Sequence, residues 1–179
     1  MDVGDFAQIE QLVAQLTDTG IDVLINKAGV YGDSNERGFG QLDYGAWTKT
    51  LAINIQAPVK MAEAFLPHLK RGDKKLLVAI SSLMGSIADN SSGGSIIYRS
   101  SKAGLNAVMK TLAIDLQEQE VGVLIFHPGW VKTDMGGENA PLEAVESVAG
   151  MWQTISAFLP ERSGSFIKYD NPTALVSKL

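Results

Sequence analysis

A tyrosine and a lysine four positions apart, Tyr98 and Lys102, have the side chains of this sequence best suited to proton transfer. Residues at that spacing share one face of a helix, and the same face continues in apolar residues: Leu105, Met109, Leu112 and Leu116. Lys102 is therefore predicted on the packed side, where its charge would favour the phenolate and lower the pKa of Tyr98 from about 10. Tyr98 would then act as an acid or base near neutral pH. For the pair taken alone, the alternative is a core tyrosine beside a lysine that extends to water.

Two further polar residues lie where a reaction could use them. Asn54 lies among apolar neighbours, and Pro58 follows four residues later. Because proline has no amide hydrogen, the Asn54 carbonyl loses its helical partner, and a freed carbonyl at a kink could hold a water or an ammonium group. A kink that only shapes packing fits the pattern equally well. Ser82 follows an apolar run and could donate a hydrogen bond to a substrate carbonyl, or it is an ordinary loop serine.

The elements that must position these residues alternate along the chain. Apolar runs predict strands at Ile21–Asn26, Lys75–Ser81, Val121–His127 and Ser165–Tyr169. Helical spacing predicts helices at Asp5–Leu16, Asp43–Leu69, Tyr98–Gln119 and Leu142–Phe158. This alternation predicts an α/β fold, a parallel sheet with helices on both faces. Ligands bind such sheets beyond the carboxyl ends of the strands, so Asn26–Gly29, Ser81–Ser82 and Pro128–Gly129 are expected at one edge.

Composition narrows the function further. The chain has 179 residues, a formal net charge of −5 and 45% hydrophobic residues, which predicts one domain over residues 1–179. An acidic chain without a Lys/Arg cluster argues against nucleic acid or an anionic membrane as the partner. With no cysteine and only two histidines, His68 and His127, no metal site is expected. No apolar run approaches the roughly 18 residues of a membrane span, and the N-terminus is acidic, so a cytoplasmic location is expected.

The polar positions, taken together in their order and spacing, resemble the short-chain dehydrogenase/reductase family. They are Asn26-Lys27-Ala28-Gly29, Asn54, Ser82, Tyr98-x-x-x-Lys102, and Pro128-Gly129 with Thr133. The segments Tyr98–Ala107 and His127–Met135 are similar to the C-factor/Sniffer-like branch of that family. The resemblance extends from Asp2 to the C-terminal strand, and it implies a Rossmann-like, doubly wound parallel sheet.

The resemblance also implies roles for individual residues. Tyr98 would be the acid/base and Lys102 would lower its pKa and bind the nicotinamide ribose, while Ser82 would orient the substrate carbonyl. Asn54 would hold a proton-relay water through its carbonyl. The implied cofactor, NAD or NADP, would be bound by these residues: Asp2, Val3, Asn26, Ala28, Gly29, Tyr98, Lys102, Pro128, Gly129, Val131 and Thr133. The implied reaction is reversible hydride transfer between NAD(P)H and a small-molecule carbonyl or alcohol.

Two departures from the family pattern qualify this interpretation. Lys27 stands where the family usually has an asparagine, which would weaken the support of that turn. The Gly-rich Thr-Gly-x-x-x-Gly-x-Gly turn that cradles the pyrophosphate is absent, so an N-terminally truncated domain is expected, with weak or no NAD(P)H binding. The strand Ile21–Ile25 would then be an exposed apolar edge. The alternatives are a non-catalytic C-factor-like signalling or interaction protein, or an inactive truncated reading frame.

Self-association is a further expectation. The family dimerises through the helices that begin near Asp43 and Tyr98, which implies a homodimer or homotetramer. Small residues on the second of these helices, Ala103, Gly104 and Ala107, would let two such helices approach closely. The same residues are equally suited to packing inside one subunit.

Overall fold

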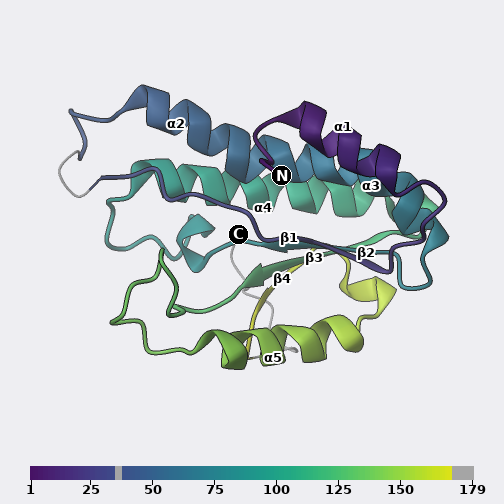
Figure 1. The fold of residues 1–179 in the computed structure, drawn as a ribbon. Helices are drawn as coiled ribbons and strands as arrows, with labels where there is room; N and C mark the ends of the chain where they lie inside the picture. The colour runs from purple at the N-terminus through teal and green to yellow at the C-terminus, as the bar shows by residue number, and fades with distance from the viewer. Residues whose placement is uncertain (35–37, 171–179) are drawn as a thin grey trace.

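A single parallel sheet forms the centre of the molecule in the computed structural model, which describes residues 1–34 and 38–170 (Figure 1). Within these residues the sheet has four strands in the order β1-β2-β3-β4. They are β1 (Val23–Asn26), β2 (Leu76–Ile80), β3 (Gly122–His127) and β4 (Ser165–Lys168). Each lies inside the segment predicted for it. Because all the pairings are parallel, the carboxyl ends of these strands meet at one edge of the sheet.

Helices cover both faces of the sheet, as the sequence predicts, but unequally (Figure 1). One face carries α1 (Phe6–Gln15), α2 (Tyr44–Leu51), α3 (Ala57–Arg71) and α4 (Ile96–Asp115), and the other carries α5 (Ala144–Ser156). Alternate residues of each strand serve the two cores. Leu77, Ala79, Val123 and Ile125 pack toward α3 and α4, whereas Leu76, Val78, Leu124 and Phe126 pack with Ile155 of α5. The α/β, Rossmann-like prediction is confirmed.

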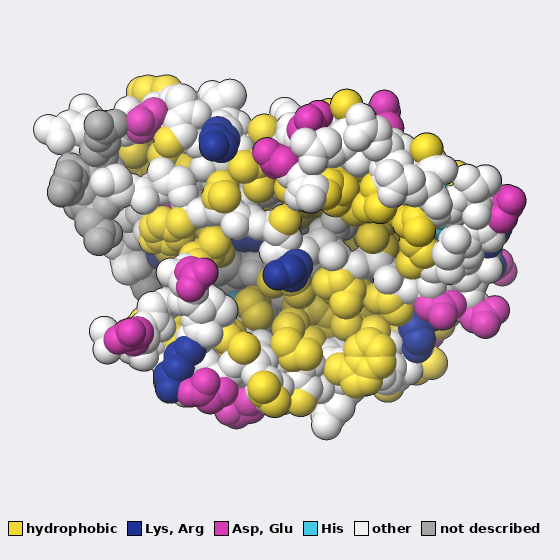
Figure 2. Space-filling view, in the orientation of Figure 1, with side chains coloured by type: hydrophobic (Ala, Val, Ile, Leu, Met, Phe, Trp, Pro, Cys, Tyr) yellow, Lys and Arg dark blue, Asp and Glu magenta, His cyan; other side chains and the backbone are white. Residues whose placement is uncertain are grey.

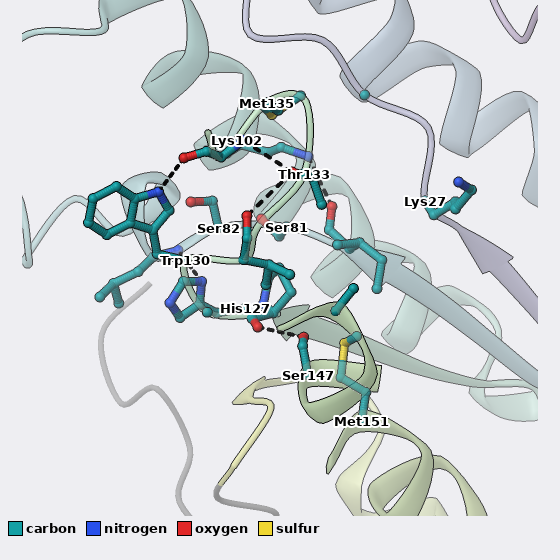
Figure 3. Close-up of a pocket in the computed structure, with 18 of the residues that line it drawn as sticks. Lys27, Ser81, Ser82, Lys102, His127, Trp130, Thr133, Met135, Ser147 and Met151 are labelled. Atoms are coloured by element: carbon teal, nitrogen blue, oxygen red, sulfur yellow. Dashed lines mark hydrogen bonds between the residues drawn. The ribbon is translucent and has the colours of Figure 1, made fainter. Parts of the chain in front are cut away.

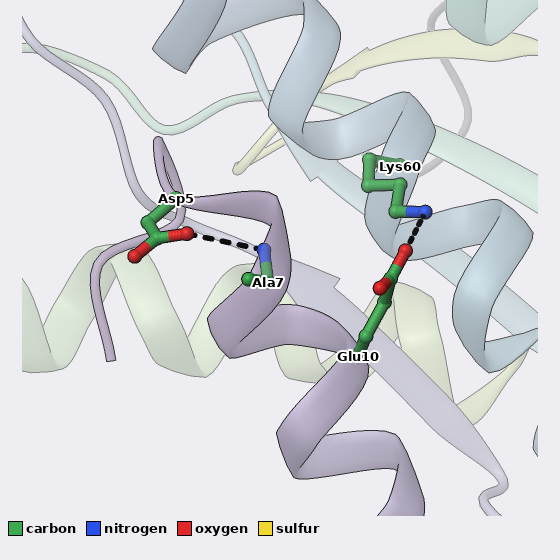
Figure 4. Close-up of polar contacts among 4 residues, drawn as sticks. All are labelled: Asp5, Ala7, Glu10 and Lys60. Carbon is green, nitrogen blue, oxygen red and sulfur yellow. Dashed lines mark hydrogen bonds and ion pairs between the residues drawn. The ribbon is translucent and has the colours of Figure 1, made fainter.

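The first helix is fixed by a cap and by burial. The Asp5 carboxylate accepts a hydrogen bond from the amide of Ala7 at 3.1 Å, which satisfies a free N–H at the start of α1 (Figure 4). An ion pair of 2.7 Å joins Glu10 to Lys60 of α3 (Figure 4). Glu10 is mostly exposed, so this pair adds little stability, and the buried side chain of Ile9 accounts for more of the attachment.

The helix predicted over Asp43–Leu69 is divided, which is a correction to the sequence analysis. One π-helical turn, η1 (Ala52–Gln56), separates α2 from α3. This turn is closed by a hydrogen bond from the amide of Ala57 to the carbonyl of Ala52, five residues earlier. The wider turn precedes Pro58, whose ring and missing amide hydrogen are incompatible with a regular α-helical turn. A short 3₁₀ turn, η2 (Leu83–Gly85), follows β2 and precedes the catalytic candidates of α4.

Strand β1 lies at the edge of the sheet, with β2 as its one neighbour among the described strands. Ile25 of β1 is 45% exposed, which confirms the predicted apolar edge. No helix in the described part of the chain is long and apolar enough to cross a membrane. Over those same residues, no group of three acidic, histidine or cysteine side chains is placed to hold a metal ion.

Candidate active site

A large cleft opens at the carboxyl ends of β1, β2 and β3. Its volume is about 1360 Å³, and apolar side chains gather around the hollow in the surface (Figure 2). Most of the predicted site residues line this cleft: Gly29, Ser82, Tyr98, Lys102, Pro128, Gly129, Val131 and Thr133. The sheet topology therefore brings together three loops that are far apart in the sequence.

Tyr98 and Lys102 lie in the first two turns of α4, and both are buried, with exposures of 8% and 5%. The Lys102 Nζ donates a hydrogen bond to the carbonyl of Ile80 at the end of β2, at 2.9 Å. It lies 5.7 Å from the centre of the Tyr98 ring. Burial lowers the pKa of Lys102 to about 8. The alternative in which the lysine extends to water is therefore wrong.

The pKa of Tyr98 is raised, and this corrects the prediction that Lys102 lowers it. Burial of the phenol disfavours the phenolate and is the largest cause; the neighbouring Tyr31 adds to it, and a hydrogen bond with Ser82 works in the opposite direction. Lys102 is not among the causes of this shift: its Nζ donates to the carbonyl of Ile80 and lies 5.7 Å from the centre of the Tyr98 ring. A phenol with a raised pKa is protonated at neutral pH, so it can donate a proton to a substrate oxygen.

Ser82 begins the η2 turn, immediately after β2. Its Oγ accepts a hydrogen bond from the amide of Met84 at 3.2 Å and is hydrogen-bonded to the Tyr98 side chain. Gly85, at the end of η2, lets this turn approach α4, because a Cβ there would lie 2.7 Å from the backbone carbon of Lys102. The close approach brings the turn that starts at Ser82 up to α4, whose residues Tyr98 and Lys102 line the same cleft (Figure 3).

Asn54 is 1% exposed and does not line the cleft. Its Oδ1 accepts from the amide of Val30 at 2.9 Å, and its Nδ2 donates to the Val30 carbonyl at 2.8 Å and to Ser101 Oγ at 2.9 Å. The side chain therefore ties the loop after β1 to α4. Asn54 thus supports this loop through Val30. Lys27, which precedes the loop, is exposed and lies apart from Ser82 and Lys102 (Figure 3). The relay through the Asn54 carbonyl stays a prediction.

The loop after β3 forms another wall of the cleft. Gly129 has a φ of +88°, a conformation that favours glycine. Ser147 of α5 donates a hydrogen bond to the Pro128 carbonyl at 2.6 Å (Figure 3). Thr133 Oγ1 accepts from the amide of Gly136 at 3.1 Å. These bonds fix the backbone of the loop, while the Thr133 side chain stays exposed beside the cleft.

The remaining predicted cofactor residues are not in the main cleft. Val3, Asn26 and Ala28 line a second cavity of about 190 Å³. Asp2 lines neither cavity, and its carboxylate accepts from the amide of Gly4 at 2.8 Å. The Asn26 Nδ2 is buried and has no hydrogen-bond partner within the described residues. The predicted cofactor residues are thus divided between two cavities that share Ile25 and Lys27.

Tyr31 and Asp33 also line the cleft, and sequence analysis missed them. The Tyr31 and Tyr98 ring centres are 4.8 Å apart, and the Asp33 carboxylate accepts a hydrogen bond from the Tyr98 amide at 2.7 Å. Both lie in a Gly-rich loop, and the sequence carries no local signal for contacts with α4. His127 lines the cleft as well. Burial lowers its pKa to about 4, so it is neutral at pH 7 and is excluded as a cationic acid there.

Comparisons with known proteins agree with this geometry. The short chain dehydrogenase family model matches residues 1–143. C-signal of Myxococcus xanthus is 42% identical over 149 residues, which cover 83% of this chain and 89% of that protein. Carbonyl reductase Sniffer of D. melanogaster has a TM-score of 0.87 at 35% identity, covering 96% of this chain and 74% of that one. The NADPH-bound carbonyl reductase from chicken fatty liver has a TM-score of 0.86 at 30% identity, covering 95% and 73%. The chain therefore belongs to the short-chain dehydrogenase/reductase family.

Proposed function

We propose that this protein is an NAD(P)(H)-dependent oxidoreductase that interconverts a carbonyl and an alcohol, with Tyr98 as its proton donor and acceptor. The observation that carries the proposal is a buried phenol hydrogen-bonded to Ser82, one helical turn from a lysine anchored at the end of β2. All three groups line one cleft at the carboxyl ends of parallel strands, where α/β proteins bind ligands. Two solved carbonyl reductases share the fold.

The residues at this cleft fit the nicotinamide-ribose end of a dinucleotide. A Cβ on Gly29 would lie 3.5 Å from Lys102 Nζ, so the loop after β1 runs directly beside the ammonium. The Pro128–Gly129 turn forms the facing wall. The cofactor, when bound, would supply or accept the hydride. Lys102 would hold the ribose hydroxyls, and Val131 and Thr133 would border the carboxamide.

The proton chemistry follows from this chain's own groups. Ser82 would hold the substrate carbonyl oxygen by a hydrogen bond, beside the phenol of Tyr98. The raised pKa of Tyr98 keeps the proton on the phenol at neutral pH, ready for donation to the oxygen. Lys102, with a pKa of about 8, is charged at pH 7, so its ammonium is available to hold the ribose hydroxyls. The cleft lining around these groups includes Met84, Met151 and Trp152, which favours an apolar substrate.

The decisive experiment compares Tyr98→Phe with Tyr44→Phe in a carbonyl-reduction assay followed by consumption of NADPH or NADH. Tyr44 is 70% exposed on α2 and serves as the matched control. The assay uses a version that also carries the N-terminal segment of a carbonyl reductase relative. Loss of reduction in Tyr98→Phe alone supports the proposal. Equal rates in the two variants would reject it.

We also propose that the 179-residue polypeptide by itself binds NAD(P)H weakly. Its sequence holds no Thr-Gly-x-x-x-Gly-x-Gly turn, and backbone amides of such a turn are the usual pyrophosphate ligands. Calorimetric titration with NADH and NADPH tests this, and a dissociation constant in the low micromolar range would contradict it. A signalling role by contact alone is less well supported, because it would leave the buried Tyr98, Ser82 and Lys102 group without a use.

Self-association through the outer faces of α2 and α4 belongs to the same proposal. Ile114 of α4 is a large apolar side chain left exposed, and Ala107 lies exposed on the same helix. Gly104, in contrast, packs inside the subunit, because a Cβ there would overlap Ile55 of η1. Sedimentation velocity measures the assembly, and a monomer at all concentrations would reject it.

A further inference from the structure

The start of α4 takes its cap from another part of the chain. Its N-cap residue, Ser95, has a left-handed φ of +46° and makes no side-chain cap hydrogen bond. The amides of the first turn therefore need other acceptors. The Asp33 carboxylate is the acceptor for two of these amides. Its Oδ1 accepts from the amide of Ile97 at 3.2 Å, and its Oδ2 accepts from the amide of Tyr98 at 2.7 Å. The backbone of the catalytic candidate is thus held by a side chain that follows β1.

Tyr31, two residues before Asp33, covers the side chain of Tyr98. Its ring lies 4.8 Å from the Tyr98 ring, centre to centre, at an interplanar angle of 32°. Its hydroxyl shares a hydrogen bond of 2.6 Å with Ser95 Oγ. One segment therefore contacts the backbone of Tyr98, the ring of Tyr98 and the residue that begins its helix.

This segment is itself fixed from behind. Asn54 accepts from the amide of Val30 and donates to its carbonyl, at 2.9 and 2.8 Å. Gly32 has a φ of +80°, and a Cβ there would overlap the Thr50 side chain of α2. The backbone at Val30 and Gly32 therefore packs closely against η1 and α2. Tyr31 and Asp33 belong to this fixed segment.

We propose that Tyr31 and Asp33 are positioning residues for Tyr98: Asp33 sets the backbone at the start of α4, and Tyr31 holds the phenol ring against Ser82 and away from water. The proposal rests on the proposed function, because accurate placement of the phenol matters only if it transfers a proton. The groups that face Tyr98 are Ser82 from the end of β2, Lys102 from the next turn of α4, and Tyr31. Asp33 reaches its backbone amide.

The first test measures the pKa of Tyr98 in the 179-residue polypeptide by NMR titration with ¹³C-labelled tyrosine. The sequence has four tyrosines, and the Tyr98→Phe spectrum identifies the signal. Tyr31→Leu removes the covering ring and admits water, so the pKa of Tyr98 is expected to fall toward its ordinary value. The matched control is Tyr44→Leu, which removes a ring stacked on Trp47 of α2 and is expected to leave Tyr98 unchanged.

The second test measures amide hydrogen exchange at Ile97 and Tyr98. Asp33→Ala leaves both amides without their acceptor, and their exchange is expected to become about tenfold faster. The control Asp43→Ala also removes a capping carboxylate, one that accepts from Ala46 at 2.9 Å at the start of α2. It is expected to leave exchange at Ile97 and Tyr98 unchanged.

Neither readout depends on turnover. If both changes occur and carbonyl reduction is absent, the proposed function fails while the positioning contacts stand. If Tyr31→Leu and Asp33→Ala fold and leave the pKa and the exchange rates of Tyr98 unchanged, or if the controls change them equally, the proposal is overturned. Should either variant fail to fold, Tyr31→Met and Asp33→Asn are expected to give the same changes at smaller size. No change in this milder pair would overturn the proposal as well.

Discussion

Replacing Lys102 by methionine tests whether the site is built at the expense of stability. Burial lowers the pKa of Lys102 from 10.5 to about 8. Because the folded-state value is the lower one, the unfolded chain binds this proton more tightly, and the charged lysine destabilises the fold. This destabilisation is largest below pH 8, and it disappears as the pH rises toward 10.5.

The size of the effect follows from the two pKa values. At about 1.4 kcal/mol per pKa unit, charged Lys102 destabilises the fold by about 3 kcal/mol. Between pH 7 and pH 9.5 about 2 kcal/mol of this is relieved. Lys102→Met also loses the hydrogen bond to Ile80, but it has no group at this position that titrates and therefore lacks the pH-dependent gain. The stability of the wild type relative to Lys102→Met should therefore rise by about 2 kcal/mol between pH 7 and pH 9.5.

Urea unfolding followed by circular dichroism measures this difference at the two pH values. The raised pKa of Tyr98 acts in the opposite direction only above its ordinary value of 10.0, outside this window. Lys70→Met is the control, because Lys70 is exposed and bonded to Gln119, and its difference from the wild type should be the same at both pH values. If the stability difference between Lys102→Met and the wild type were also the same at both pH values, the predicted destabilisation by charged Lys102 would be refuted. The folded state would then hold the charge without a cost in stability.

Three further predictions concern the scaffold. Gly85→Ala places a Cβ 2.7 Å from backbone of α4 and should lower the free energy of unfolding by about 2 kcal/mol; Gly38→Ala, with nothing within 4 Å, should not, and equal urea midpoints would contradict this. Ile25→Lys charges the exposed residue of the edge strand, so light scattering on concentration should decrease; unchanged scattering would show that this edge does not drive association. Asn54→Ala removes three hydrogen bonds, one of them buried and two partly buried, and should cost about 3 kcal/mol with faster amide exchange at Val30; protection of that amide in the variant would argue against the role given to Asn54.

The strands, most helix positions and the edge where the site lies could be predicted because their signals are local. The run Leu76–Ile80 is apolar at every position, as a strand buried on both faces requires. Lys27 follows β1, Ser81–Ser82 follows β2 and the Pro128–Gly129 turn follows β3, and parallel pairing is sufficient to bring such positions together. The Tyr98 and Lys102 spacing required only the period of a helix.

The sequence predicts only a kink at Pro58, because a proline can be accommodated by a kink or by a wider turn, and the spacing does not distinguish the two. The ionisation of the site was predicted with the wrong sign for Tyr98. Sequence spacing shows that a cation lies near a phenol, but not how much water either group loses. That loss is set by Tyr31, Ser82 and the end of β2, which reach Tyr98 and Lys102 only in the folded chain. The sequence by itself determined which groups meet and at which edge of the sheet, because periodicity and strand ends are local properties. Tertiary structure decided how those groups are charged and held, because burial and capping by Asp33 depend on segments distant along the chain.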